Sequence, residues 1–298
     1  GASVGREGPT VQIGASIMQS LGKFTRFSRV ETKRGLILAG GAAGVAAAFN
    51  TPLAGIVFAI EEMSRNYESR TSGTVLTSVI VAGIVSIWWL GDYTYFGTTS
   101  AILNGASAWV PVIVCGLLGG VLGGIFSQVL IFVSRGIPGK LGIFAKANPV
   151  MFAAICGFML AVIGALSGST TFGTGYHEAR SILEGSGDIP ESFGILKLLA
   201  TLISYISGIP GGVFAPSLAV GAGLGQNIAH MMPYAPLGAV VVLGMVAYFA
   251  GVVQAPVTAF VIVIRLEPIC SRPTTSMSRS PQSIALCNSF FVETSTVG

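Results

Sequence analysis

Apolar residues form long runs in this chain, and polar residues gather in the short segments between them. The runs cover residues 73–90, 109–133, 149–166 and 237–264. Each approaches or exceeds the ~20 residues that an α-helix needs to cross the core of a bilayer. The pattern therefore predicts an all-α protein that crosses the membrane several times.

The composition supports this class and adds a detail. Only 9% of the 298 residues are charged and 52% are hydrophobic, whereas about a quarter of an ordinary soluble domain is charged. The 41 glycines and 14 prolines are unusual for straight helices. Glycine lets helices approach closely, and proline interrupts them where a cavity or a neighbour satisfies the freed backbone. We therefore expect a bundle of tilted and broken helices.

Basic residues gather in three polar segments, which the positive-inside rule places in the cytoplasm. The chain between the first two segments must then enter the membrane and return. We expect its break at Asn50-Thr51-Pro52, because proline disfavours helix at the residue before it. Residues 91–107 and 176–192 would lie outside. The net charge of +4 is spread over these segments and implies no nucleic-acid partner. The basic residues are Lys23, Arg26, Arg29, Lys33 and Arg34; Arg65 and Arg70; and Arg135, Lys140 and Lys146.

An internal repeat organises the chain. GREGPTVQIGA, residues 5–15, and GVFAPSLAVGA, residues 212–222, share Gly, Pro, Gly and Ala at the same offsets. Roughly forty residues beyond each proline follow NTPLAGIVFAIE, from Asn50, and QAPVTAFVIVIR, from Gln254. Transporters are often built from inverted repeats whose short, broken helices aim their N-termini at a site near the midplane. We expect the same arrangement here.

The chain changes character at Arg265, after which it is rich in Ser and Thr and has no run that could span a membrane. The repeat predicts Glu at this position, where Glu61 stands in the first half. We therefore divide the chain into a partial transmembrane domain, 1–264, and an atypical polar tail, 265–298, which is a genuine extension or, as we favour, the result of a reading-frame shift. We expect the tail to be disordered. Because residue 1 lies inside a motif, we expect the domain to be incomplete at its N-terminus.

Both glycine-proline motifs could bind an anion at a helix N-terminus. The first N–H groups of a helix have no intrahelical partner and carry a partial positive charge of about half an electron. Gly5, Gly8, Gly211 and Gly212 leave such amides uncovered. Partial charges suit a conduit, because a full cation would hold chloride too tightly for rapid release. The alternative is that these glycines and prolines only allow close helix packing.

Two acidic residues could act with such a site. Glu7 lies at the mouth of the first motif, where its carboxylate would compete for the anion position and would swing away on protonation. It could gate the path and carry a proton, with Arg6 neutralising it. Glu62, beside Glu61, ends an apolar helix at the predicted inner face, where a separate proton route needs a second acid. The alternative for Glu7 is a glutamate that is favoured at a helix N-terminus by the helix dipole. The alternative for Glu62 is a solvated helix end whose carboxylate pairs with Arg65 or Arg70.

These segments resemble the CLC family of chloride channels and chloride/proton antiporters. The matching segments are GREGP at 5–9, AAFNTPLAGIVFAIEEM at 47–63 and SGIPGGVFAP at 207–216, in the family's order and at similar intervals. The resemblance extends from Gly1 to Ile264. It implies a CLC-like fold and transport of chloride or a similar small anion coupled to proton antiport. It also implies a homodimer in membrane lipid, expected in the inner membrane of a prokaryote, with bound chloride as substrate, no other cofactor and no metal.

The resemblance implies roles for individual residues. Glu7 matches the family's external gating glutamate, and Glu62 matches the internal proton-transfer glutamate of its antiporters. The anion ligands that it implies are the amides of Val213 and Phe214 at the centre and those of Arg6, Glu7 and Gly8 at the outer site. The family's inner serine would precede Gly1, and its tyrosine ligand has no counterpart after Arg265. The preferred anion is therefore left open.

Two other functions fit parts of the sequence. A passive chloride channel, gated by voltage or pH, would need no proton coupling; Glu62 favours an antiporter, because channels of the family generally lack an acid there. GASVG, residues 1–5, fits the G-x-S-x-G nucleophile pattern around Ser3 and would indicate a membrane hydrolase. The two histidines, His177 and His230, are not placed by the sequence as its base. We therefore expect a transporter and not an enzyme.

Overall fold

The computed structural model describes residues 1–24, 30–63, 69–91, 96–97, 99, 101, 103, 108–136, 139–187 and 189–264. Regular structure in these residues is helical, apart from one isolated bridge between two glycines. The tail, 265–298, lies outside the described residues, as do Arg26, Arg29 and Arg65 of the basic segments. The helices are α1 (Glu7–Phe24), α2 (Val30–Phe49), α3 (Pro52–Phe58), the π-helical turn η1 (Ala59–Met63), α4 (Ser69–Leu90), α5 (Trp109–Ser134), α6 (Gly139–Ala147), α7 (Pro149–Leu166), α8 (Tyr176–Glu184), α9 (Phe193–Ile206), α10 (Phe214–Met231), α11 (Leu237–Val253) and α12 (Pro256–Ile264).

Three helices in the described part are long and apolar enough to cross a membrane: Gly73–Leu90 of α4, α5 and α7. At most 28% of each of these stretches is buried, so most of their apolar side chains face outward. These spans confirm three of the four predicted apolar runs. The fourth run, 237–264, is interrupted near Gln254 and forms the shorter helices α11 and α12. The structure is a multi-pass helical membrane fold.

The two halves break their helices in the same way. After α2 the backbone turns through Asn50, which has φ +52°, and Pro52 begins α3. After α11 it turns through Gln254, which has φ +62°, and Pro256 begins α12. Few residues other than glycine adopt this left-handed conformation. Its recurrence at matching positions confirms the predicted break at Asn50-Thr51-Pro52 and supports the repeat.

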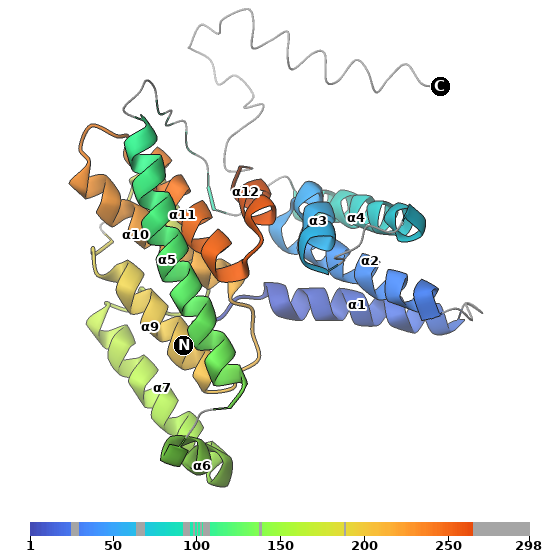
Figure 1. Cartoon of the computed structure of the whole chain (residues 1–298), viewed down its shortest axis with the longest axis horizontal. Helices are drawn as coiled ribbons and strands as arrows, with labels where there is room; N and C mark the ends of the chain where they lie inside the picture. Colours follow the sequence, from blue (N-terminus) through green and yellow to red (C-terminus); the bar gives the residue numbers. More distant parts are fainter. Residues whose placement is uncertain are drawn as a thin grey trace, which may run out of the picture. The chain divides into compact units, whose positions relative to one another are not determined.

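The helix pairs of the two halves also cross at matching positions. α1 lies along α2, and α10 packs on α11, which in turn packs on α5 (Figure 1). A Cβ atom on Gly14 of α1 would overlap the carbonyl oxygen of Gly40 in α2. A Cβ atom on Gly244 of α11 would lie 2.7 Å from the carbonyl oxygen of Gly221 in α10. Gly14 and Gly221 are equivalent in the repeat, as are Gly40 and Gly244, so both crossings depend on small residues at the same points.

Candidate anion site

The two glycine-proline motifs meet at a backbone bridge. The N–H of Gly5 donates to the carbonyl of Gly212 over 2.6 Å, and the N–H of Gly212 donates to the carbonyl of Gly5 over 2.8 Å. The pairing is antiparallel. Because these residues are equivalent in the repeat, an antiparallel pair between them places a local two-fold axis through the bridge. α1 and α10 therefore start beside one point and leave it in opposite senses, as an inverted repeat requires.

Glu7, at the start of α1, lies against this bridge. Its side chain is only 1% exposed. A Cβ atom on Gly5 would overlap its Oε2, and a Cβ atom on Gly212 would lie 3.0 Å from the same oxygen. The carboxylate therefore folds over the two glycines where the halves meet. Arg6 precedes it with an exposed side chain, and its carbonyl accepts the N–H and the hydroxyl of Thr10 over 3.1 and 2.7 Å.

The first turns of α1 and α10 bring backbone amides to the same place. A Cβ atom on Gly212 would lie 2.9 Å from the nitrogen of Gly8, so the two backbones are in close contact. Val213 precedes α10, and its carbonyl accepts the N–H of Ser217 over 3.0 Å. The amides of Gly8, Val213 and Phe214 belong to the first turns, where N–H groups have no partner within the helix. Such a pair of N-termini can bind an anion without a full positive charge.

Phe214 combines this backbone position with an aromatic side chain packed against both halves. Its ring centroid lies 6.4 Å from that of Phe49, 5.8 Å from that of Phe58 and 5.1 Å from that of Phe249. These partners belong to α2, α3 and α11. The second motif is therefore enclosed by an apolar cluster on the side of its ring.

The two acids of η1 differ in their surroundings. Glu62 is exposed, four residues after Phe58. Glu61 accepts hydrogen bonds at the start of α12: from the N–H of Val257 over 3.1 Å, and from the N–H and hydroxyl of Thr258 over 2.7 and 2.8 Å. Glu61 thus caps a helix of the second half and joins the halves. Any pairing of Glu62 with the side chain of Arg65 or Arg70 lies outside the described residues.

Sequence reasoning missed a buried polar stripe on α9. Lys197, Thr201 and Ser204 recur at helical spacing and are at most 2% exposed. Lys197 Nζ donates to the carbonyls of Thr171, Phe172 and Gly173 over 2.8, 3.4 and 2.9 Å. These three bonds match its three N–H groups and fix the chain between α7 and α8. The available signal was a lysine and two hydroxyls on one face of an apolar helix, because polar groups within membrane helices are often functional.

Ser3 contacts this stripe and not a histidine. Its N–H donates to Ser204 Oγ over 2.9 Å, and its hydroxyl lies 2.9 Å from Thr201 Oγ1. His230 is near the end of α10, about 24 Å along that helix from the bridge at a rise of 1.5 Å per residue. His177 lies on α8, with its ring 5.1 Å from that of Tyr176. In the described residues no hydrogen bond of the kind that the hydrolase hypothesis requires joins either histidine to Ser3.

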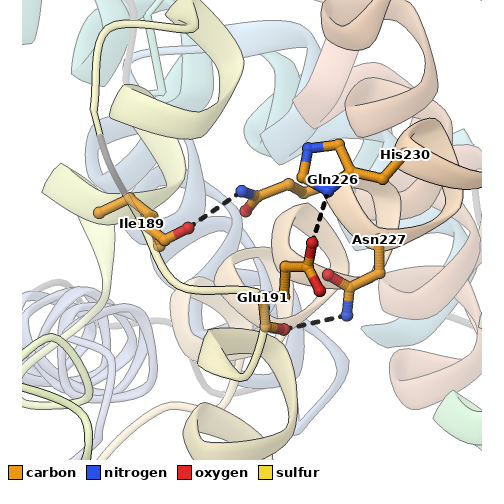
Figure 2. A network of polar contacts seen from close by, with 5 residues as sticks. All are labelled: Ile189, Glu191, Gln226, Asn227 and His230. Carbon is orange, nitrogen blue, oxygen red and sulfur yellow. Dashed lines mark hydrogen bonds and ion pairs between the residues drawn. The ribbon is translucent and has the colours of Figure 1, made fainter. Parts of the chain in front are cut away.

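His230 belongs to a network on the loop that follows α8. Figure 2 shows the loop residues Ile189 and Glu191 facing the last turns of α10. Gln226 donates to the carbonyl of Ile189 over 3.1 Å, and Asn227 donates to that of Glu191 over 3.0 Å. His230 Nδ1 lies 3.2 Å from the Glu191 carboxylate. These contacts fasten the loop to the end of α10 far from the bridge.

The chain is similar to known transport proteins. It matches the family model described as voltage gated chloride channel over residues 1–268. It is 32% identical to the H(+)/Cl(-) exchange transporter ClcA of Yersinia pestis, covering 89% of this chain and 57% of that relative. It is 29% identical to the ClcA of Vibrio vulnificus, covering 89% and 59%. The chain therefore spans less than two thirds of the length of these relatives.

Solved structures show the same fold. The chain is similar to a CLC-type fluoride/proton antiporter with a TM-score of 0.74 and 27% identity, covering 89% of this chain and 69% of that one. It is also similar to a slow cyanobacterial Cl-/H+ antiporter with a TM-score of 0.70 and 28% identity, covering 90% and 64%.

Proposed function

The chain belongs to the voltage gated chloride channel family, and from this premise we propose that it forms the anion pathway of a transporter that exchanges chloride, or a similar small anion, for protons. The proposal assigns the anion to the paired N-termini of α1 and α10. Glu7 acts as the gate and outer proton carrier, and Glu62 as the inner proton acceptor. A homodimer in the inner membrane of a prokaryote is part of the proposal.

The bridge between Gly5 and Gly212, with the Glu7 carboxylate folded over it, carries the proposal. A deprotonated carboxylate at paired helix N-termini occupies the place that an anion would take, because both are attracted by the same amides. Protonation removes that attraction, so the side chain can leave and an anion can enter. Glu7 then takes up or releases one proton each time an anion enters or leaves the site.

Glu62 supports exchange over passive conduction. It is exposed beside Glu61, whose carboxylate is bound to the start of α12. Glu62 is therefore the acid of this turn that remains open to solvent protons. Phe58, four residues before Glu62, packs its ring against that of Phe214, the first residue of α10, so apolar side chains connect the turn of Glu62 with the proposed anion site.

Proton uptake driven by a chloride gradient in liposomes tests the proposal. The parent protein should move protons, and Glu62→Gln should lower proton movement at least about tenfold while anion flux continues. Glu184→Gln, which changes an acid of α8, should leave proton movement unchanged. Anion flux without proton movement in the parent would support the passive channel instead. Repeating the flux with fluoride separates the two anions named for the similar antiporters.

A further inference from the structure

Both motifs of the candidate site are attached to one helix, α9. We call residues 1–6 the first cradle loop and residues 207–213 the second cradle loop. The second cradle loop follows α9 directly in the chain. The first cradle loop is attached to the same helix through Ser3, by bonds of 2.9 Å to Ser204 Oγ and of 2.9 Å to Thr201 Oγ1.

The direction of each hydrogen bond is fixed by the helix. The Thr201 hydroxyl donates to the carbonyl of Lys197 over 2.8 Å, and the Ser204 hydroxyl donates to the carbonyl of Ala200 over 2.7 Å. A hydroxyl has one hydrogen to donate. Both oxygens therefore accept from Ser3, which donates once through its N–H and once through its own hydroxyl. Ser3 is fully buried, so these groups have no exchange with bulk water.

The cradle loops also contact each other directly. The bridge joins two glycines, whose backbones adopt many conformations. Val4 also contacts the second cradle loop, because a Cβ atom on Gly211 would lie 2.6 Å from Val4 Cβ. Ser3 adds a second point of attachment, because its two hydrogen bonds hold the first cradle loop to α9 at a specified distance and angle.

We propose that Thr201 and Ser204 are positioning residues that set the spacing of the two cradle loops, and thereby the width of the anion site. α9 serves as a common template: one loop is joined to it covalently, and the other is held by its hydroxyls. The proposal rests on the proposed function for the anion itself, but the attachment of the loops does not depend on it. Neither hydroxyl contacts the anion.

If the Thr201 and Ser204 hydroxyls only bonded carbonyls of their own helix, removing them would not affect the anion site. Hydroxyls in helices commonly bond the carbonyl four residues earlier. Thr77 of α4 does this, donating to the carbonyl of Gly73 over 2.8 Å from an exposed position. Thr77→Val is therefore a matched control for Thr201→Val, because it removes the same bond from a helix that does not hold a cradle loop.

Amide hydrogen exchange at Gly5 and Gly212 is the first measurement. Thr201→Val, Ser204→Ala and Ser3→Ala should each accelerate exchange at both glycines about tenfold, because the bridge opens more often. Thr201→Ser should restore the parent rate, and Thr77→Val should not change it. Ser3→Ala removes the same contact from the side of the first cradle loop and leaves α9 unchanged, so the test stands even if Thr201→Val fails to fold. Unchanged exchange at the two glycines overturns the proposal.

Chloride affinity and turnover in liposomes are the second measurement. Thr201→Val and Ser3→Ala should raise the KM for chloride about tenfold while the maximal rate changes less than about twofold. The double variant of Thr201→Val and Ser3→Ala should raise the KM no further, because both changes remove the same hydrogen bond between Ser3 and Thr201. Faster exchange with unaltered KM overturns the claim that α9 sets the anion site. If the parent transports no chloride and the variants still show faster amide exchange than the parent, the attachment of the loops is supported and the proposed function fails.

Discussion

The starts of α1 and α10 occupy equivalent positions about the bridge but carry different side chains. In GREGP the third residue is Glu7, whose carboxylate is buried against Gly5 and Gly212. In GVFAP the third residue is Phe214, whose ring packs among Phe49, Phe58 and Phe249. The backbone frame is shared, whereas the chemistry is not.

This difference separates two tasks. The repeated glycines and prolines place two helix N-termini at one point, where the proposed function assigns the anion. A second carboxylate at the position of Phe214 would repel the first and desolvate poorly. With an acid on one motif and an aromatic ring on the other, the proposed site has its carboxylate on one side, from which a proton would act on the anion.

Glu7→Gln tests the acid side of this comparison and should have the largest effect. Glutamine keeps the size of the side chain but cannot release a proton. Proton movement driven by a chloride gradient should fall to the level of protein-free liposomes. Anion flux should continue and lose its dependence on pH. Both fluxes can be followed with ion-selective electrodes, and a pH dependence that persists would remove Glu7 from the gating role.

Gly212→Ala tests the shared frame. The added methyl group would lie 2.9 Å from the Gly8 nitrogen and 3.0 Å from the Glu7 carboxylate, so the bridge must open. The KM for chloride should rise about tenfold, as expected for a loss of roughly 1.4 kcal/mol in binding. Gly116→Ala of α5 is the control, because a Cβ atom there meets nothing within 4 Å. Equal behaviour of the two variants would argue against the bridge.

Phe214→Ala tests the aromatic side. Removing the ring leaves a cavity among three other rings, and the protein should lose about 3 kcal/mol of stability. A thermal unfolding scan in detergent would show this as a lowered midpoint. Phe158→Ala is the control, since the Phe158 side chain is 71% exposed on α7 and packs little. A midpoint that falls equally in both variants would mean that the cluster contributes no specific packing.

Glu61→Gln and Glu62→Gln test the second point at which the halves differ. The two carboxylate oxygens of Glu61 accept three hydrogen bonds from the start of α12. Glutamine keeps one acceptor oxygen and loses the negative charge, so stability should fall by about 1.5 kcal/mol. Glu62→Gln, at an exposed position, should change stability by less than about 0.5 kcal/mol. The same thermal scan compares them. The reverse order would mean that Glu62 holds the halves together.

The periodic features of this fold could be predicted from the sequence. The apolar runs that became α4, α5 and α7 and the break at Asn50 depend on residues close in the chain. The repeat added which segments are equivalent, because both copies carry the same Gly-Pro spacing. The roles given to Glu7 and Glu62 stay predictions.

The contacts that join distant segments could not be predicted. Ser3 meets Thr201 and Ser204 across about 200 residues of chain. The residues near Ser3 in the sequence do not indicate its partners, and the GASVG pattern predicted a nucleophile instead. Glu61 and Glu62 are neighbours of the same type, and the hydrogen bonds of Glu61 to α12 depend on where that helix packs. Local pattern determines helices, whereas the choice among polar partners is made by tertiary packing.

The bridge has a bearing on how such a molecule could arise. Gly5 and Gly212 are equivalent residues that bond to each other, which makes the contact isologous: one surface meets its own copy. A half-length chain assembled as a symmetric pair therefore holds every group needed to close it. Duplication and fusion of such a chain would keep this contact while the two copies diverge, one toward an ionisable group and the other toward an aromatic one.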